Sequence, residues 1–168
     1  MKHPWRRIGA YLIDYCVILI WMAALAVCAQ TGLLRLSEIG DNQFWPRLAL
    51  QAQAFLILTL PVYLYFTLSE SFGWTGTIGK RLTRLQVKGS PPQKIFRNIL
   101  KFLPWELAHT AIWHGMDVPF QSDPSQLAWI LFATSLGLSM LYVSGLFIGQ
   151  GRPLYDRLAG TVVILSNR

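Results

Sequence analysis

Three apolar stretches constrain this chain more than any other feature of its sequence. They cover residues 8–29, 48–68 and 127–148. Each is long enough to cross a bilayer, since a membrane-spanning helix needs about 20 mostly apolar residues. Only 14% of the chain is charged, whereas soluble domains carry about 25% charged residues. The sequence therefore predicts an all-α integral membrane protein, folded as a single domain over residues 1–168.

The basic residues predict how the chain is threaded through the membrane. Thirteen of the fifteen lysines and arginines fall in residues 2–7, 80–101 and 152–168. Such clusters mark cytoplasmic segments, so both termini are expected to be cytoplasmic. An even number of crossings is then required, and the polar residues 102–120 are predicted to supply the fourth. The expected architecture is a multi-pass bundle of about four transmembrane helices, three clear and one polar or partial.

Two further elements are expected on the cytoplasmic face. The segment KIFRNILKFL, residues 94–103, places basic and apolar residues on different helical faces, as an amphipathic helix on the inner leaflet does. The alternative is a plain basic end to the third crossing in chain order, residues 102–120. The segments KRLTRLQV (80–87) and DRLAGTVV (156–163) share a pattern and end in β-prone residues. Our hypothesis is that residues 84–88 and 161–165 pair as two short strands, the alternative being coincidence.

Asp14 lies inside the first apolar stretch, where a charge costs on the order of 3 kcal/mol. This aspartate favours an uncleaved helix over a signal peptide, although residues 24–26 resemble a cleavage site. A buried carboxylate either takes up a proton or is held charged by a cation. Arg7 lies about 10 Å away along the same helix. Arg152 and Arg157 of the C-terminal segment are the other candidate partners.

The segments WRRIGAYLID, TIGKRLTRLQV and LYDRLAGTVV together resemble the RDD family of membrane proteins, which is named for an arginine and two aspartates. The residues that match the family motifs, with the adjacent Arg157 as a further ion-pair candidate, are Arg7, Asp14, Thr77, Gly79, Lys80, Arg81, Asp156 and Arg157. Tyr155 departs from the pattern, because members often carry histidine there, and this weakens any proton-relay role at that position. The resemblance implies an integral protein of the cytoplasmic (inner) membrane of a prokaryote.

Two functions are expected from this resemblance and from the buried charges. In the first, the protein is an adaptor or assembly partner of other membrane proteins, and Arg7, Asp14 and Asp156 are structural. In the second, it is a small transporter, with cation/proton exchange at Asp14 and with Glu106 and His109 as relay residues three apart on one helical face.

The expected partners are the anionic inner leaflet and other membrane proteins or further copies of the chain, and not nucleic acid. No enzymatic activity, metal or cofactor is expected, because the sequence has no HExxH motif, no GxSxG motif and no phosphate-binding glycine loop. The one Glu-x-x-His pair, Glu106 and His109, is a single copy, whereas a dinuclear metal site in a helical bundle uses two.

Overall fold

The computed structural model describes residues 3–31, 44–72, 76–117, 122–148 and 151–166. Lys2, residues 118–120 and Arg168, which entered the sequence analysis, lie outside these ranges. In chain order the elements are α1 (Pro4–Gln30), α2 (Phe44–Ala54), the π-helical turn η1 (Phe55–Thr59), α3 (Leu60–Ser71), α4 (Ile78–Leu82), β1 (Leu85–Lys88), α5 (Pro91–Gly115), α6 (Gln126–Phe147), α7 (Leu154–Leu158) and β2 (Val162–Leu165).

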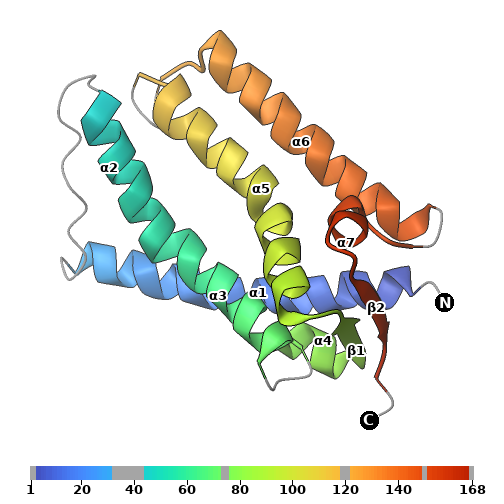
Figure 1. Ribbon diagram of the computed structural model, residues 1–168. Coiled ribbons are helices and arrows are strands. Elements are labelled where there is room, and N and C mark those ends of the chain that lie inside the picture. Colours follow the sequence, from blue (N-terminus) through green and yellow to red (C-terminus); the bar gives the residue numbers. More distant parts are fainter. Residues whose placement is uncertain (1–2, 32–43, 73–75, 118–121, 149–150, 167–168) are drawn as a thin grey trace.

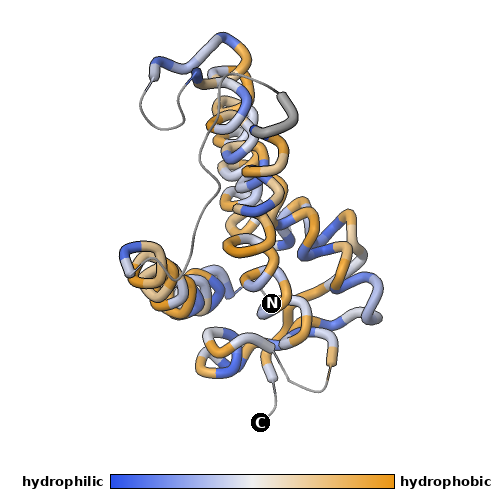
Figure 2. The backbone as a smooth tube through the Cα atoms, turned by 90° about the vertical axis from the view of Figure 1, so that its left-hand side faces the viewer, coloured by the Kyte–Doolittle hydropathy of each residue, from blue (hydrophilic) through white to orange (hydrophobic). Residues whose placement is uncertain are grey.

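The described residues contain three helices that are long and apolar enough to cross a membrane, and these confirm the all-α membrane class. They are Pro4–Gln30, Arg47–Ser71 and Gln126–Phe147. The second consists of α2, η1 and α3, which follow one another without a break. Figure 1 shows this helix, α5 and α6 side by side, whereas α1 runs across them near their lower ends. In Figure 2, α1 is seen almost end-on and set apart from the others.

Only the first half of α1 is buried. Arg7, Ala10 and Asp14 are its buried residues, and their spacing of three and four places them on one helical face. This face packs against α4. Beyond it α1 exposes large apolar side chains such as Leu19 and Ile20, as expected of a helix that contacts lipid.

Pro61 explains both the π-helical turn and the contact that α1 makes with it. A proline has no N–H, so the carbonyl four residues earlier loses its helical partner. That carbonyl belongs to Ile57, and it accepts a hydrogen bond from the indole of Trp21 in α1, at 3.3 Å. The turn itself closes with a bond from the Leu60 N–H to the Phe55 carbonyl. A neighbouring helix thus satisfies the free backbone group, as a bilayer requires.

The helix α5 joins two segments that the sequence analysis treated separately. It begins at a capping box formed by Ser90 and Gln93 and continues unbroken through Pro104 to Gly115. The predicted amphipathic segment 94–103 is therefore the basic first part of the helix that carries the predicted polar span, and this agrees with the alternative reading of that segment. Figure 1 shows that α5 changes direction partway along its length.

Neighbouring helices satisfy several polar groups of α5. Pro104 frees the Leu100 carbonyl, which accepts a hydrogen bond from the Tyr142 hydroxyl of α6 at 2.9 Å. On the other side, Thr110 and His114 both bond Gln51 of α2, at 3.0 and 2.7 Å. Contacts with α2 and α6 therefore satisfy Thr110, His114 and the Leu100 carbonyl without water, as a bilayer requires.

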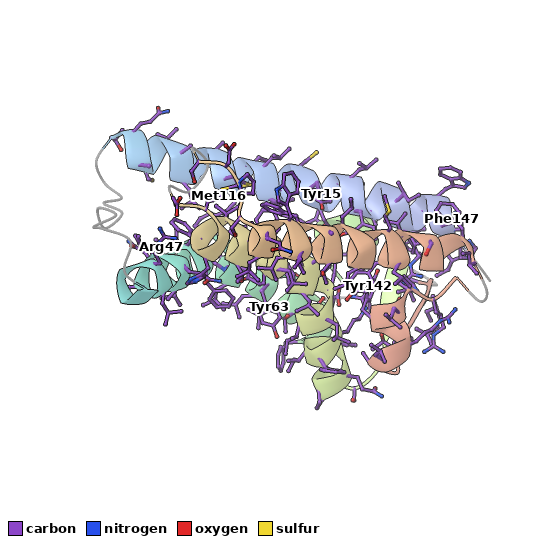
Figure 3. All side chains as sticks on the ribbon, turned by 90° about the horizontal axis from the view of Figure 1, so that it is seen from above. Tyr15, Arg47, Tyr63, Met116, Tyr142 and Phe147 are labelled. Atoms are coloured by element: carbon purple, nitrogen blue, oxygen red, sulfur yellow. The ribbon has the colours of Figure 1, made fainter. Side chains whose placement is uncertain are left out.

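At the C-terminal end of α5, a residue of α2 bonds the backbone that follows the helix. Arg47 donates to the Met116 and Asp117 carbonyls, each at 2.8 Å. Figure 3 shows Arg47 close to Met116, with Tyr142 much farther along toward Phe147. Unpaired carbonyls at a helix C-terminus need such donors, so these contacts fix the position of the α5 terminus relative to α2.

The predicted strand pairing is confirmed. β1 and β2 are antiparallel, with Leu85 opposite Leu165 and Lys88 opposite Val162. Each strand follows a five-residue helix, α4 or α7. Two residues after the end of each helix the backbone enters the left-handed region, at Arg84 (φ 56°) or Gly160 (φ 68°). The repeated sequence pattern therefore corresponds to two similar helix–strand units that meet along their strands.

Candidate functional site

A chain of buried charges joins the short helices α4 and α7 to the longer helices α1, α3 and α5. We call it the buried ion cluster, and it consists of Arg7, Glu70, Lys80, Arg97 and Asp156. These residues come from α1, α3, α4, α5 and α7. Their side chains are at most 8% exposed. Buried ions require partners, because each loses its hydration on folding.

Arg97 is the centre of the buried ion cluster. Its Nε donates to the Asp156 carboxylate at 2.6 Å, and its Nη1 donates to the Glu70 carboxylate at 2.9 Å. The side chain is 0% exposed. One guanidinium therefore links α3, α5 and α7, in the planar geometry that suits arginine to carboxylates.

Asp156 is held charged in this environment. Burial on its own raises the pKa of Asp156, but the charges of Arg97 and Arg7 outweigh burial and lower that pKa below its ordinary value. The Thr161 hydroxyl, at 3.1 Å, completes the set of donors around the carboxylate. Asp156 is therefore an anionic acceptor for groups from α1, α5 and its own segment.

Arg7 connects the first helix to the last. Its guanidinium donates to the Asp156 carboxylate and to the Gly151 carbonyl. Two residues about 150 positions apart in the chain are thus held together. Both are family-motif residues, but their sequence positions do not predict that they pair with each other.

Asp14 lies beside the cluster, buried to 1% exposure, but it has a different kind of partner. Its carboxylate accepts hydrogen bonds from the Thr77 hydroxyl at 2.6 Å, the Gly79 N–H at 2.9 Å and the Tyr65 hydroxyl at 3.0 Å. These donors fix the start of α4 against α1.

The prediction that an arginine of the C-terminal segment pairs with Asp14 is wrong. Arg152 donates to the Thr161 carbonyl at 2.9 Å, and Arg157 donates to the Arg152 carbonyl at 3.0 Å. The physical reason is that the start of α4 already supplies Asp14 with donors. The two arginines instead stabilise the turns around α7.

The residues of the segment TIGKRLTRLQV (77–87) that match the family motifs have separate roles. Thr77 caps α4 and bonds Asp14, while Lys80 forms an ion pair with Glu70 at 2.7 Å. Gly79 permits the contact between α4 and α1, because a Cβ at this position would lie 2.0 Å from the Ala10 carbonyl oxygen. Arg81 is exposed on the same short helix.

The proposed relay residues are not joined to the cluster. His109 bonds the Trp105 carbonyl through Nδ1 at 3.1 Å. Glu106 has a buried Oε1 with no hydrogen-bond partner among the described residues. Within the part of the chain that the structure describes, no hydrogen bond or ion pair connects either residue to Asp14.

Sequence reasoning missed Arg97 and Glu70. Arg97 was assigned to a basic helical face turned toward lipid headgroups, yet it points into the protein. Glu70 did carry a signal, because it is the one acid in a segment, residues 69–101, that holds seven basic residues. A lone acid among so many bases is a candidate for a buried partner.

A small cavity adjoins the cluster. Arg7, Asp14, Lys80 and Arg97 line it together with apolar residues, and its volume is about 10 Å³. That size is close to the lower limit for one water molecule. In the described ranges, no group of three or more His, Cys, Asp or Glu residues could hold a metal ion.

The neighbouring arginines Arg6 and Arg7 allow a matched test of the cluster. Arg6 is exposed, whereas Arg7 is buried on Asp156. We expect Arg7→Met to lower the free energy of unfolding by about 2 kcal/mol, because hydrogen bonds to charged groups are worth about 1.5–3 kcal/mol each. Arg6→Met should change it by less than about 0.5 kcal/mol. Denaturant unfolding in detergent, followed by tryptophan fluorescence, measures both, and equal effects would contradict the assigned role of Arg7.

The comparison with known proteins agrees with the motif residues. The model of the RDD family matches residues 1–160. That range includes Arg7, Asp14 and Asp156 and every element up to α7. No curated protein and no solved structure matches the chain.

Proposed function

This chain belongs to the RDD family, and on that premise we propose that it is an adaptor or assembly partner of other membrane proteins. We place it in the cytoplasmic membrane of a prokaryote with both termini cytoplasmic, where its basic segments would contact the anionic inner leaflet. No enzymatic activity is part of this proposal.

One observation carries the proposal: the family-motif charges are engaged in holding the fold together. Arg7 and Asp156 pair with each other, and Asp14 accepts three hydrogen bonds that attach α4 to α1. A carboxylate that binds a transported cation needs access and free coordination sites. Asp14 is 1% exposed and occupied by protein donors, which favours a structural role.

The surface of the long helices supports the same proposal. Along α6, large side chains such as Trp129, Leu136 and Met140 are about 60% exposed. Figure 2 shows apolar residues along much of the helical backbone. Lipid contacts account for part of this surface, and helices of another membrane protein pack on surfaces of the same chemistry.

The second candidate function, cation/proton exchange at Asp14, is favoured by the cavity. The cavity places Asp14 beside Lys80 and Arg97. Buried ionisable groups of this kind often mark ion paths. In this alternative, Asp14 would release Thr77 or Tyr65 to bind a cation or proton.

A flux assay separates the two functions. We expect purified protein in liposomes to move Na⁺, K⁺ and H⁺ no faster than protein-free liposomes. Asp14→Asn should lower the thermal midpoint, because an amide cannot accept from all three donors, and should leave the background flux unchanged. Flux above background that Asp14→Asn abolishes, with the amount of folded protein preserved, would instead establish exchange. Arg6→Met serves as the folded control in both measurements.

A further inference from the structure

Lys101 is a buried amine that none of the interactions above uses. It lies on α5, one helical turn after Arg97. Its Nζ is enclosed and has no hydrogen-bond partner among the described residues. The nitrogen lies 3.4 Å from the centroid of the Phe66 ring and 5.0 Å from that of Tyr11. An ammonium group has three donors to satisfy, and aromatic faces replace hydrogen-bond acceptors poorly.

The charges around Lys101 are balanced without it. The cations Arg7, Lys80 and Arg97 face an equal number of carboxylates, which are Asp14, Glu70 and Asp156. Glu70 and Asp156 are each bound by two of these cations, and Asp14 is occupied by neutral donors. A protonated Lys101 would add a positive charge with no carboxylate left to pair with it.

The groups that surround Lys101 come from all the helices packed there. They are Tyr11 and Asp14 of α1, Phe66 and Glu70 of α3, Lys80 of α4 and Arg97 of α5. Attraction between an ammonium and an aromatic ring offsets only part of the loss of hydration. The cations Lys80 and Arg97 oppose a further positive charge.

We propose that Lys101 is a neutral amine at neutral pH and is a proton-binding site at the junction of α1, α3, α4 and α5. The ligand is the proton itself. Protonation places an unbalanced charge inside the junction and weakens the packing of α3 and of Tyr11 of α1 around Lys101. The site is independent of the proposed adaptor role. If the protein does exchange protons, this amine is a carrier that is separate from Asp14.

The direction of the pH effect follows from the pKa. Burial, reinforced by the charge of Lys80, lowers the pKa of Lys101 well below its ordinary value of 10.5. In the unfolded chain the amine keeps its ordinary pKa and binds a proton that the folded protein lacks. Stability therefore rises with pH between the folded and unfolded pKa values, by up to about tenfold in the unfolding equilibrium per pH unit.

Lys101→Met tests this in the full chain, purified in detergent. We expect this variant to be more resistant to unfolding than the wild type at pH 6. Its free energy of unfolding should also lack the rise between pH 6 and 9 that the loss of one proton causes. Lys88→Met, which removes an exposed lysine, should keep that rise. A Lys101→Met protein that is less stable than the wild type at every pH, with the rise intact, would overturn the proposal.

A second measurement uses the wild-type protein and applies if the Lys101→Met variant cannot be obtained in folded form. In wild-type protein with ¹⁵N-labelled lysine, NMR distinguishes a neutral amine from an ammonium group. We expect one lysine Nζ to be neutral at pH 7 and to be missing from the spectrum of Lys101→Arg. Ammonium signals from every lysine at pH 7 would show that Lys101 is an ordinary charged residue.

Discussion

Gly79→Ala is expected to destabilise the protein by about 3 kcal/mol or more, a loss that is large for one methyl group. The added Cβ would lie 2.0 Å from the Ala10 carbonyl oxygen and 3.0 Å from the Asp14 carboxyl carbon. The nearest atom belongs to backbone, so α4 must move away from α1. That movement would also break the bond from the Gly79 N–H to Asp14.

Gly137→Ala is the matched control for this effect. Gly137 lies within α6, and a Cβ there would meet no atom within 4 Å. Alanine is the better helix former by about 1 kcal/mol, so this variant should be as stable as the wild type or slightly more stable. The comparison uses the yield of folded, monodisperse protein and its thermal midpoint in detergent. Indistinguishable values for the two variants would show that α4 does not press on α1 as described.

Arg97→Met is expected to cost about 3–5 kcal/mol, the range measured when one partner of a buried ion pair is removed. Methionine fills similar space but leaves Asp156 and Glu70 with one cation each. Three elements, α3, α5 and α7, lose their common contact at once. Denaturant unfolding in detergent should show the change in midpoint.

The control for Arg97→Met is Lys94→Met, one turn earlier on α5, where the side chain is partly exposed. This substitution should change stability by less than about 1 kcal/mol. The loss of stability in Arg97→Lys should lie between those of the other two variants. An ammonium restores the charge but cannot bridge two carboxylates in the same plane. If Arg97→Met were no worse than Lys94→Met, the cluster would not hold these helices together.

The elements that local pattern determines were predicted well. The apolar stretch 127–148 corresponds to α6 (Gln126–Phe147) within one residue at each end. The pairing of residues 84–88 with 161–165 was predicted from a repeated eight-residue pattern, and the strands pair in that region. The existence of each helix or strand follows from neighbouring residues, because span length and β propensity are local properties. The pairing of the two strands came instead from the repeat of one pattern at two distant places in the chain.

The partners of the buried charges were not predictable in the same way. Asp14 was expected to pair with an arginine, yet α4 supplies hydroxyl and backbone donors in its place. Arg97 looks like a lipid-facing residue by its helical spacing, and only the packing of α3 and α7 against α5 shows that it is buried. The pairings of Arg7, Asp14 and Arg97 with residues of other helices join residues from 27 to 149 positions apart, and single-sequence periodicity carries no information over such separations.

The pairing of β1 with β2 has a consequence for biosynthesis. β1 leaves the ribosome well before α6, whereas β2 follows α6. Arg97 and the hydrogen-bonding edge of β1 therefore remain without Asp156 and β2 until α6 has been translated and delivered to the membrane. The two strands can therefore pair only after the last long helix has been made. A chain arrested before that point presents an open strand edge and an arginine that is paired with Glu70 but still lacks Asp156, and an open strand edge is a feature that protein quality control can act on.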